Sequence, residues 1–263
     1  MALRSALINA MANAARKAQR SLIRDFNEVE HLQVSKKGPA DFVSAADRKA
    51  EKILQQELAK LRPDFGFVME EGGRIEARDG KHYWVIDPLD GTTNFLHGIP
   101  HFAISVAVRR DDELVAGIVL DVVRDELFWA EKGVGAYVNE RRIRVSARRK
   151  LPEAVFGTGI PFLGRPGHAP FLKEMTSVMA EVAGIRRMGA AALDLAYVAA
   201  GRYDGFWEAG LSPWDMAAGI VLVREAGGTV SDLAGGDKML ETGGIVAAND
   251  VLHAPLRKLL AKA

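Results

Sequence analysis

A short apolar run ends abruptly in two carboxylates, a proline and a glycine in the stretch Trp84-Val85-Ile86-Asp87-Pro88-Leu89-Asp90-Gly91-Thr92-Thr93-Asn94-Phe95. The β-branched residues near its start are typical of a buried strand. Pro88 cannot donate a hydrogen bond to a neighbouring strand. We therefore expect the strand to end at about Pro88, which places Asp87 and Asp90 in the turn that follows.

Asp87 and Asp90 are close enough in such a turn to repel each other unless a cation lies between them. The fixed φ of Pro88 leaves the Leu89 carbonyl free to face the same ion. Hard oxygen ligands of this kind favour Mg²⁺, Mn²⁺ or Ca²⁺. The alternative is a solvated, Asp-rich turn that caps a helix.

The residues after Asp90 suit an anion. Gly91 lets the N–H groups that follow approach an anion closely, and Thr92 and Thr93 add hydroxyls beside them. The spacing does not fit an EF-hand, which needs acids at alternate positions, or the aspartyl-phosphate enzymes, which need Asp-x-Asp. A metal and a phosphate could therefore share this turn.

The composition indicates an ordinary globular protein. The chain has 263 residues, 48% of them hydrophobic and 26% charged, and a formal net charge of +1 that favours neither nucleic acid nor membrane partners. The absence of cysteine excludes disulfides, thiolate zinc sites and cysteine-nucleophile phosphatases. Arg4 interrupts the first apolar stretch, and no apolar run is long enough to span a membrane. We expect a soluble, cytoplasmic protein.

The first half of the chain predicts two helices and a sheet. Helical spacing of apolar residues predicts an amphipathic helix over residues 3–26 and another over 44–61, with a short extended segment at 33–39. A strand at 65–69 ends at Glu70. Short alternating strands then predict an antiparallel sheet with members at 103–108, 115–120, 126–130 and 136–138.

A basic run at residues 141–150 separates this sheet from a second kind of pattern. Its plainer interpretation is a solvated connector, although an acidic or nucleic-acid partner could also bind there. After it, strands and helices alternate over 154–157, 169–182, 184–188, 192–200, 205–207, 214–225 and 245–247, before a final helix. We predict an α+β subdomain with an antiparallel sheet over 1–145 and an α/β subdomain over 146–263, joined in one compact catalytic unit.

Acidic residues recur at strand ends and helix starts. Besides Asp87 and Asp90, Glu70 ends a predicted strand, Asp215 opens a predicted helix, and Asp47 lies near the start of the second helix. Carboxylates at helix starts usually cap the helix or stabilise its dipole, although Asp47 is slightly too deep for a cap. Strand ends and helix starts can also converge on one site.

Two motifs resemble the signatures of the inositol monophosphatase family. The first is residues 84–97, and the second is residues 214–219 together with 225–228. Residues 193–202 and 204–208 are especially similar to the bacterial branch called SuhB. The resemblance covers essentially the whole chain. It implies a layered αβαβα sandwich, within the α+β and α/β classes, and Mg²⁺-dependent, lithium-inhibited hydrolysis of small phosphate monoesters, in a family where homodimers are common.

The resemblance also implies roles for individual residues. Two or three Mg²⁺ ions would be held by Glu70, Asp87, the Leu89 carbonyl, Asp90 and Asp215. The catalytic residues would be Thr92, which orients the attacking water, and the proton acceptors Asp47 and Glu70. The substrate would be bound by Asp90, Gly91, Thr92, Thr93, Ala191 and Glu208. Ala190 stands where the family usually has Ser or Thr.

Three functions remain open. The first is hydrolysis of inositol 1-phosphate and related polyol phosphates by a metal-activated water. The second keeps this chemistry but takes fructose 1,6-bisphosphate, a nucleotide or histidinol phosphate. The third is a SuhB-like regulatory partner in transcription antitermination, for which the basic run and the pair Arg186-Arg187 are candidate contacts.

Overall fold

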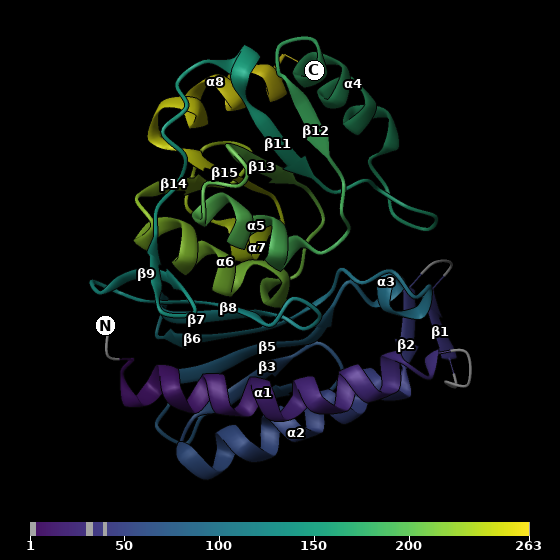
Figure 1. Cartoon of the computed structure of the whole chain (residues 1–263), viewed down its shortest axis with the longest axis vertical. Helices are drawn as coiled ribbons and strands as arrows, with labels where there is room; N and C mark the ends of the chain where they lie inside the picture. The colour runs from purple at the N-terminus through teal and green to yellow at the C-terminus, as the bar shows by residue number, and fades with distance from the viewer. Residues whose placement is uncertain (1–3, 30–33, 39–40, 263) are drawn as a thin grey trace.

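The computed structural model describes residues 4–29, 34–38 and 41–262. Its layers follow one another as helices, sheet, helices, sheet and helices (Figure 1). Helices α1 and α2 cover the outer face of the larger sheet, α5 and α6 lie between the two sheets, and α4 and α8 cover the outer face of the smaller sheet. The predicted αβαβα sandwich is confirmed.

The N-terminal layer consists of two amphipathic helices. Helix α1 (Ala6–Phe26) begins after Ser5, whose hydroxyl accepts a hydrogen bond from the Ile8 amide at 3.1 Å. Helix α2 (Ala45–Leu61) packs beside it, and both bury alanine and leucine side chains against the sheet. Between them, β1 (Val34–Gly38) and β2 (Asp41–Ser44) form an antiparallel pair. Positions 3, 33 and 39 of the predicted elements lie outside the described residues.

The larger sheet, as far as the structure describes the chain, has eight strands in the order β10-β9-β8-β7-β6-β5-β3-β4. They are β3 (Gly66–Met69), β4 (Gly73–Ile75), β5 (His82–Asp90), β6 (Ala103–Arg110), β7 (Glu113–Asp121), β8 (Glu126–Glu131), β9 (Gly135–Val138) and β10 (Arg141–Ile143). The predicted antiparallel pairing is confirmed from β6 to β9. It extends to β5 on one side and to β10 on the other, whereas β3 runs parallel to β5. The basic run was predicted as a connector, but it begins as an edge strand because Ile143 is buried beside β9.

The smaller sheet has the order β12-β11-β13-β15-β14 in the described part of the chain. Its strands are β11 (Val155–Thr158), β12 (Gly184–Arg186), β13 (Gly205–Glu208), β14 (Gly228–Ser231) and β15 (Ile245–Asn249). The helices are α3 (Thr92–Leu96), α4 (His168–Met179), α5 (Ala191–Ala199), α6 (Pro213–Glu225), α7 (Met239–Thr242) and α8 (Asp250–Leu260), and a 3₁₀ turn, η2, spans Leu151–Glu153. The predicted alternation of strands and helices is therefore present, with β14 and α7 added.

The buried helix α6 is held close to both of its neighbours by glycines. A Cβ on Gly117 of β7 would lie 2.8 Å from the backbone of Ala218, and one on Gly219 would lie 2.5 Å from the Leu195 side chain of α5. The hydroxyl of Ser105 on β6 donates to the Trp214 carbonyl of α6 at 3.1 Å. Because Ser105 pairs with Asp87 on β5, the first turn of α6 lies over the end of that strand.

The end of β5 differs from the prediction. The strand continues through Pro88 to Asp90, so the two aspartates lie in the strand and not in a turn after it. Asp87 pairs with Ser105 and Asp90 pairs with Ala103, which leaves Pro88 and Leu89 as a bulge opposite a single residue of β6. A bulge needs no ladder hydrogen bond from proline, so the strand does not have to stop there.

Candidate active site

The bulge of β5 is organised by its own aspartate. Asp87 is buried, and its Oδ1 accepts a hydrogen bond from the Leu89 amide at 2.9 Å. The Leu89 carbonyl accepts one from the Thr92 hydroxyl, also at 2.9 Å. A carbonyl oxygen has a second lone pair, so this contact still allows Leu89 to bind a cation. The bulge thus holds a carboxylate, a carbonyl oxygen and a hydroxyl close together.

Gly91 connects β5 to the short helix α3 and is its N-cap residue. Its φ is +94°, in the left-handed region that suits glycine. A Cβ there would also lie 3.1 Å from the His101 carbonyl and 3.3 Å from the Phe102 Cα. Thr92 is half-buried and Thr93 is exposed. This turn therefore depends on glycine for both conformation and space.

A second group of acids comes from α2 and the end of β3. Carboxylate oxygens of Asp47, Glu70 and Glu71 lie within 4.8 Å of one another. Asp47 is buried in the first turn of α2, and Glu70 and Glu71 are half-buried. One turn further along α2, Glu51 accepts a hydrogen bond from the Glu71 amide at 2.9 Å.

Glu51 and Glu71 were not among the predicted site residues. Glu51 lies four residues after Asp47, a spacing that puts both side chains on one face of α2. This spacing is the sequence feature from which Glu51 could have been predicted as a site residue. Only the fold shows that this face meets the turn carrying Glu70.

Asp215 reaches the site from the first turn of α6. Its Oδ2 accepts a hydrogen bond from the Ser212 amide at 2.7 Å, so the carboxylate stabilises the helix start as the pattern predicted. It also raises the pKa of Asp87 and of Asp90 by charge repulsion. Asp215 can therefore stabilise the start of α6 and belong to the acid cluster at the same time.

The acids at the end of β5 are crowded by like charges. Burial is the largest cause that raises the pKa of Asp87 well above its usual range, and repulsion from Glu70, Asp90, Asp215 and Asp47 adds to it. For Asp90, burial again comes first and Asp215 second, opposed by a hydrogen bond from the Ala192 amide at 2.8 Å. The predicted acidic ligands thus share one electrostatic environment.

Glu208, at the end of β13, forms another side of the same environment. Its pKa is raised to about 8, first by burial and then by Asp215, while Arg187 and Arg165 act in the opposite direction. Asp194 of α5, which the sequence did not single out, is buried, and burial followed by repulsion from Glu208 raises its pKa. The sequence feature that could have identified Asp194 is a lone acid within an otherwise apolar helix.

Helix α5 begins without a capping side chain at its own N-cap position. Ala190 holds the N-cap position, with φ −146° and ψ 96°, where a Ser or Thr hydroxyl would accept an amide hydrogen bond. Ala191 follows as the first residue of the helix and is buried. The α5 amides at this end face Asp90, through Ala192. The alanine at 190 therefore supplies no capping hydroxyl, and Asp90 accepts the Ala192 hydrogen bond from another element.

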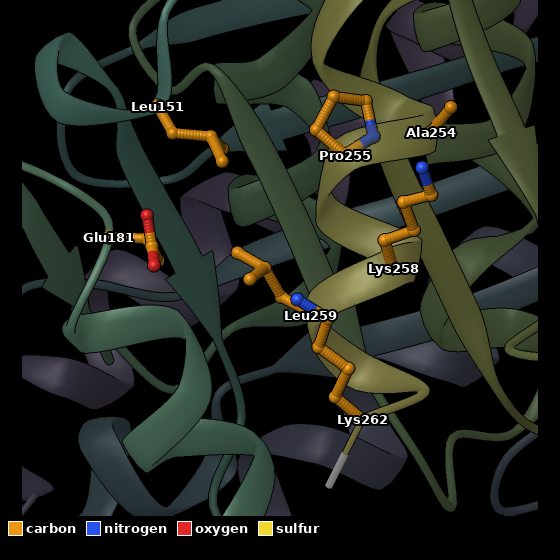
Figure 2. A pocket seen from close by; sticks show the side chains of 7 residues that line it. All are labelled: Leu151, Glu181, Ala254, Pro255, Lys258, Leu259 and Lys262. Carbon is orange, nitrogen blue, oxygen red and sulfur yellow. The ribbon is translucent and has the colours of Figure 1, made fainter.

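The donor set fits hard divalent cations. It consists of carboxylates and one backbone carbonyl, and its buried members repel one another. A separate cavity lies in the outer layer of the fold. Figure 2 shows this cavity of about 410 Å³, which is lined by Leu151, Glu181, Ala254, Pro255, Lys258, Leu259 and Lys262. None of these residues belongs to the acid cluster. No helix in the described ranges is both long and apolar enough to span a membrane.

The sequence is similar to proteins of known name over nearly its whole length. It is 59% identical over 259 residues to the inositol-1-monophosphatase of Mesorhizobium japonicum, covering 98% of this chain and 97% of that protein. The inositol-1-monophosphatase of Rhizobium meliloti is 60% identical over 257 residues, with the same coverage. The Nus factor SuhB of Escherichia coli strain K12 is 45% identical over 243 residues, covering 92% and 91%.

The fold agrees with this similarity. The crystal structure of the extragenic suppressor protein suhB from Bartonella henselae matches with a TM-score of 0.96 and 57% identity, over 98% of this chain and all of that one. The model of the inositol monophosphatase family matches residues 3–263. The chain therefore belongs to the inositol monophosphatase family.

Proposed function

We propose that this chain is an inositol-1-monophosphatase that requires Mg²⁺ and hydrolyses inositol 1-phosphate and related polyol phosphates. The observation that carries the proposal is the convergence of acids from four elements beside the glycine turn at the end of β5. Two proteins named inositol-1-monophosphatase that are 59% and 60% identical support the same substrate.

In this proposal, the acids at the end of β5 hold the metal. The ligands would be Glu70, Asp87, the Leu89 carbonyl, Asp90 and Asp215. Two or three Mg²⁺ ions bound there would polarise the phosphoryl oxygens, lower the pKa of a water and stabilise the leaving oxygen. The carboxylates would exchange mutual repulsion for attraction to the ions, which offsets the cost of burying them.

The turn after β5 binds the phosphate and positions the attacking water. The backbone N–H groups of Gly91, Thr92 and Thr93 face the phosphoryl oxygens. The Thr92 hydroxyl donates to the Leu89 carbonyl, so its own lone pairs are left to accept from a water. Asp47 and Glu70 are the carboxylates to which that water then loses its proton.

The polyol lies toward β13 and α5. Glu208 accepts a hydrogen bond from a substrate hydroxyl, while Asp90 and the first turn of α5, at Ala191, complete this side. Arg187 and Arg165 lie close enough to Glu208 to affect its pKa. A substrate with a second phosphate, such as fructose 1,6-bisphosphate, would use those two arginines, and it is the alternative within the same chemistry.

The test is phosphate release from a panel of inositol 1-phosphate, fructose 1,6-bisphosphate, histidinol phosphate and a nucleotide ester. Each is assayed with Mg²⁺, with chelator, and with added Li⁺. We expect turnover that needs Mg²⁺, is inhibited by Li⁺ and is fastest with inositol 1-phosphate. Faster turnover of another ester would contradict the proposed substrate. Turnover in the presence of chelator would contradict the proposed requirement for Mg²⁺.

A second function is favoured by the Nus factor SuhB relatives. These proteins, from Escherichia coli and Pseudomonas aeruginosa, are 45% and 49% identical to this chain. The exposed arginines of the basic run, such as Arg144 and Arg149, are available to an acidic partner. The test is whether the protein captures transcription antitermination factors. Capture by wild type, lost when Arg144 and Arg149 are both changed to alanine while hydrolysis is retained, would support this role. No capture at low salt would contradict it.

The proposal includes a homodimer, as the family resemblance implies, and a cytoplasmic location, as the sequence pattern predicts. Apolar side chains are exposed on the segment before α4 and on α4 itself, at Phe162, Leu163 and Leu172. A second copy could bury such a surface. Sedimentation equilibrium is expected to give twice the chain mass, and the mass of a single chain would contradict the dimer.

A further inference from the structure

Gly159 follows the last residue of β11 and lies beside Glu208. Strands β11 and β13 run parallel, with Thr158 paired to Trp207. The Thr158 hydroxyl donates to the Trp207 carbonyl at 2.9 Å, which holds the two strand ends together. The next residues along the chain, Gly159 and Glu208, therefore lie side by side at this end of the sheet.

The carboxylate of Glu208 fills the space that a side chain at position 159 would take. A Cβ on Gly159 would lie 1.8 Å from Oε1, 1.9 Å from Cδ and 2.3 Å from Oε2 of Glu208. The approach of 1.8 Å is the shortest for any glycine in the described ranges. Gly159 is not among the glycines with positive φ. Its requirement is therefore space and not backbone conformation.

Two other crowded glycines, one on β11 and one on β7 of the larger sheet, serve packing. A Cβ on Gly157 would lie 3.0 Å from the Tyr203 ring, and one on Gly117 would lie 2.8 Å from the backbone of α6. At Gly159 the neighbour is the end of a flexible side chain, which can rotate away. A methyl group there should therefore move the Glu208 carboxylate without unfolding the sheet.

We propose that Gly159 is a positioning residue for substrate recognition. It keeps the Glu208 carboxylate against the backbone at the end of β11, where the carboxylate meets the substrate. This inference rests on the proposed function, in which Glu208 accepts a hydrogen bond from a polyol hydroxyl. With alanine at position 159 the hydroxyl loses this acceptor, while the phosphate contacts at the end of β5 stay in place.

The test compares inositol 1-phosphate with phenyl phosphate, which has no hydroxyl for Glu208. In Gly159→Ala, kcat/KM for inositol 1-phosphate should fall about tenfold, mainly through KM, because the substrate hydroxyl loses its hydrogen bond to Glu208. The value for phenyl phosphate should change less than about twofold. Glu208→Ala should give the same pattern, and the double variant should lose no more than either single variant.

The matched control is Gly184→Ala on β12 of the same sheet. A Cβ there meets only the Arg186 guanidinium, at 3.2 Å, and both rates should stay at their wild-type values. A crystal structure of Gly159→Ala gives a readout that does not depend on activity. We expect the Glu208 carboxylate to be displaced in it.

Two results would overturn the positioning role. One is a Gly159→Ala enzyme that keeps its preference for inositol 1-phosphate while Glu208→Ala loses it. The other is a crystal structure in which the carboxylate stays and the end of β11 shifts. Failure of the proposed function looks different: the wild-type enzyme would then show no preference for inositol 1-phosphate, and Glu208→Ala would change neither rate.

Discussion

Asp90 at the end of β5 and Asp204 before β13 are both nearly excluded from solvent, but their surroundings are opposite. Asp204 accepts hydrogen bonds from the Val155 amide at 2.8 Å and from the Ser146 hydroxyl, and it pairs with the Arg148 guanidinium. Asp90 accepts one amide hydrogen bond, and burial followed by repulsion from other carboxylates raises its pKa. Burial alone therefore does not distinguish a structural acid from a site acid.

Asp121 supports this distinction. It is fully buried, and it accepts from the amides of Val123 and Arg124 and pairs with the Arg124 guanidinium. The structural acids are thus neutralised by a cation from the chain itself. The acids of the site repel one another, and the arrangement becomes favourable when a cation is added. The comparison yields five predictions, from the largest expected effect to the smallest.

The largest effect is expected for Asp90→Asn. It removes a proposed metal ligand and should lower kcat about a thousandfold or more. The free energy of unfolding of the metal-free protein should stay equal or rise, because one of several repelling charges is gone. Phosphate release and urea unfolding, measured on the same preparation, check both parts. A large loss of stability would contradict the distinction.

Asp204→Ala is the matched variant and should behave in the opposite way. It leaves the Val155 amide and the Ser146 hydroxyl without their acceptor, which should lower the free energy of unfolding by about 2–3 kcal/mol. The kcat of the folded fraction should stay within about twofold of wild type. Urea unfolding measures the free energy of unfolding. An active-site titration gives the folded fraction, from which kcat is calculated. A thousandfold lower kcat in a folded protein would count against the account.

Glu51→Ala tests whether Glu51 positions the turn that carries Glu70 and Glu71. Glu51 accepts the hydrogen bond from the Glu71 amide and so holds the turn beside Asp47. Without it, the Mg²⁺ concentration at half-maximal rate should rise about tenfold, as for other residues that orient metal ligands. A Mg²⁺ titration of the rate measures this value. If the titration curve matches wild type, Glu51 does not support the ligands.

The stability of the metal-free protein should fall as the pH rises, and added metal should weaken this dependence. The folded protein raises the pKa of Asp87, Asp90 and Glu208, the last from 4.5 to about 8. It therefore binds their protons more tightly than the unfolded chain does. The Glu208 contribution is complete below about pH 4.5 and is lost as the pH rises through about 8.

In chelator, the thermal midpoint should therefore fall between pH 6 and pH 9, and Mg²⁺ should raise it by several degrees, more at pH 9 than at pH 6. Thermal unfolding at several pH values measures this difference. An equal effect of Mg²⁺ at all pH values would mean that proton release and metal binding are not linked.

The smallest effect is expected at the start of α5. Ala190→Ser supplies the missing capping hydroxyl and should raise the free energy of unfolding by about 1 kcal/mol. Urea unfolding can resolve this change. An unchanged or lower stability would show that the Ala190 backbone cannot present a capping side chain.

Much of this arrangement could be predicted from local pattern. The amphipathic helices, the antiparallel strands and the acids at strand ends each depend on residues close in sequence. Pro88 misled the prediction because whether a proline ends a strand depends on the pairing of β5 with β6, which the local sequence does not show. Residues whose role comes from distant contacts, such as Glu51, Asp194 and Gly159, were missed for the same reason.

The most direct test of the account is a Mg²⁺ titration of phosphate release from inositol 1-phosphate by three proteins: wild type, Asp90→Asn and Asp204→Ala. We predict a rate near zero without metal and saturation with Mg²⁺ for wild type and for the folded fraction of Asp204→Ala, with no recovery in Asp90→Asn at any Mg²⁺ concentration. A wild-type rate that does not depend on Mg²⁺, or an Asp90→Asn rate equal to that of wild type, would contradict the central claim that the crowded acids form the catalytic metal site.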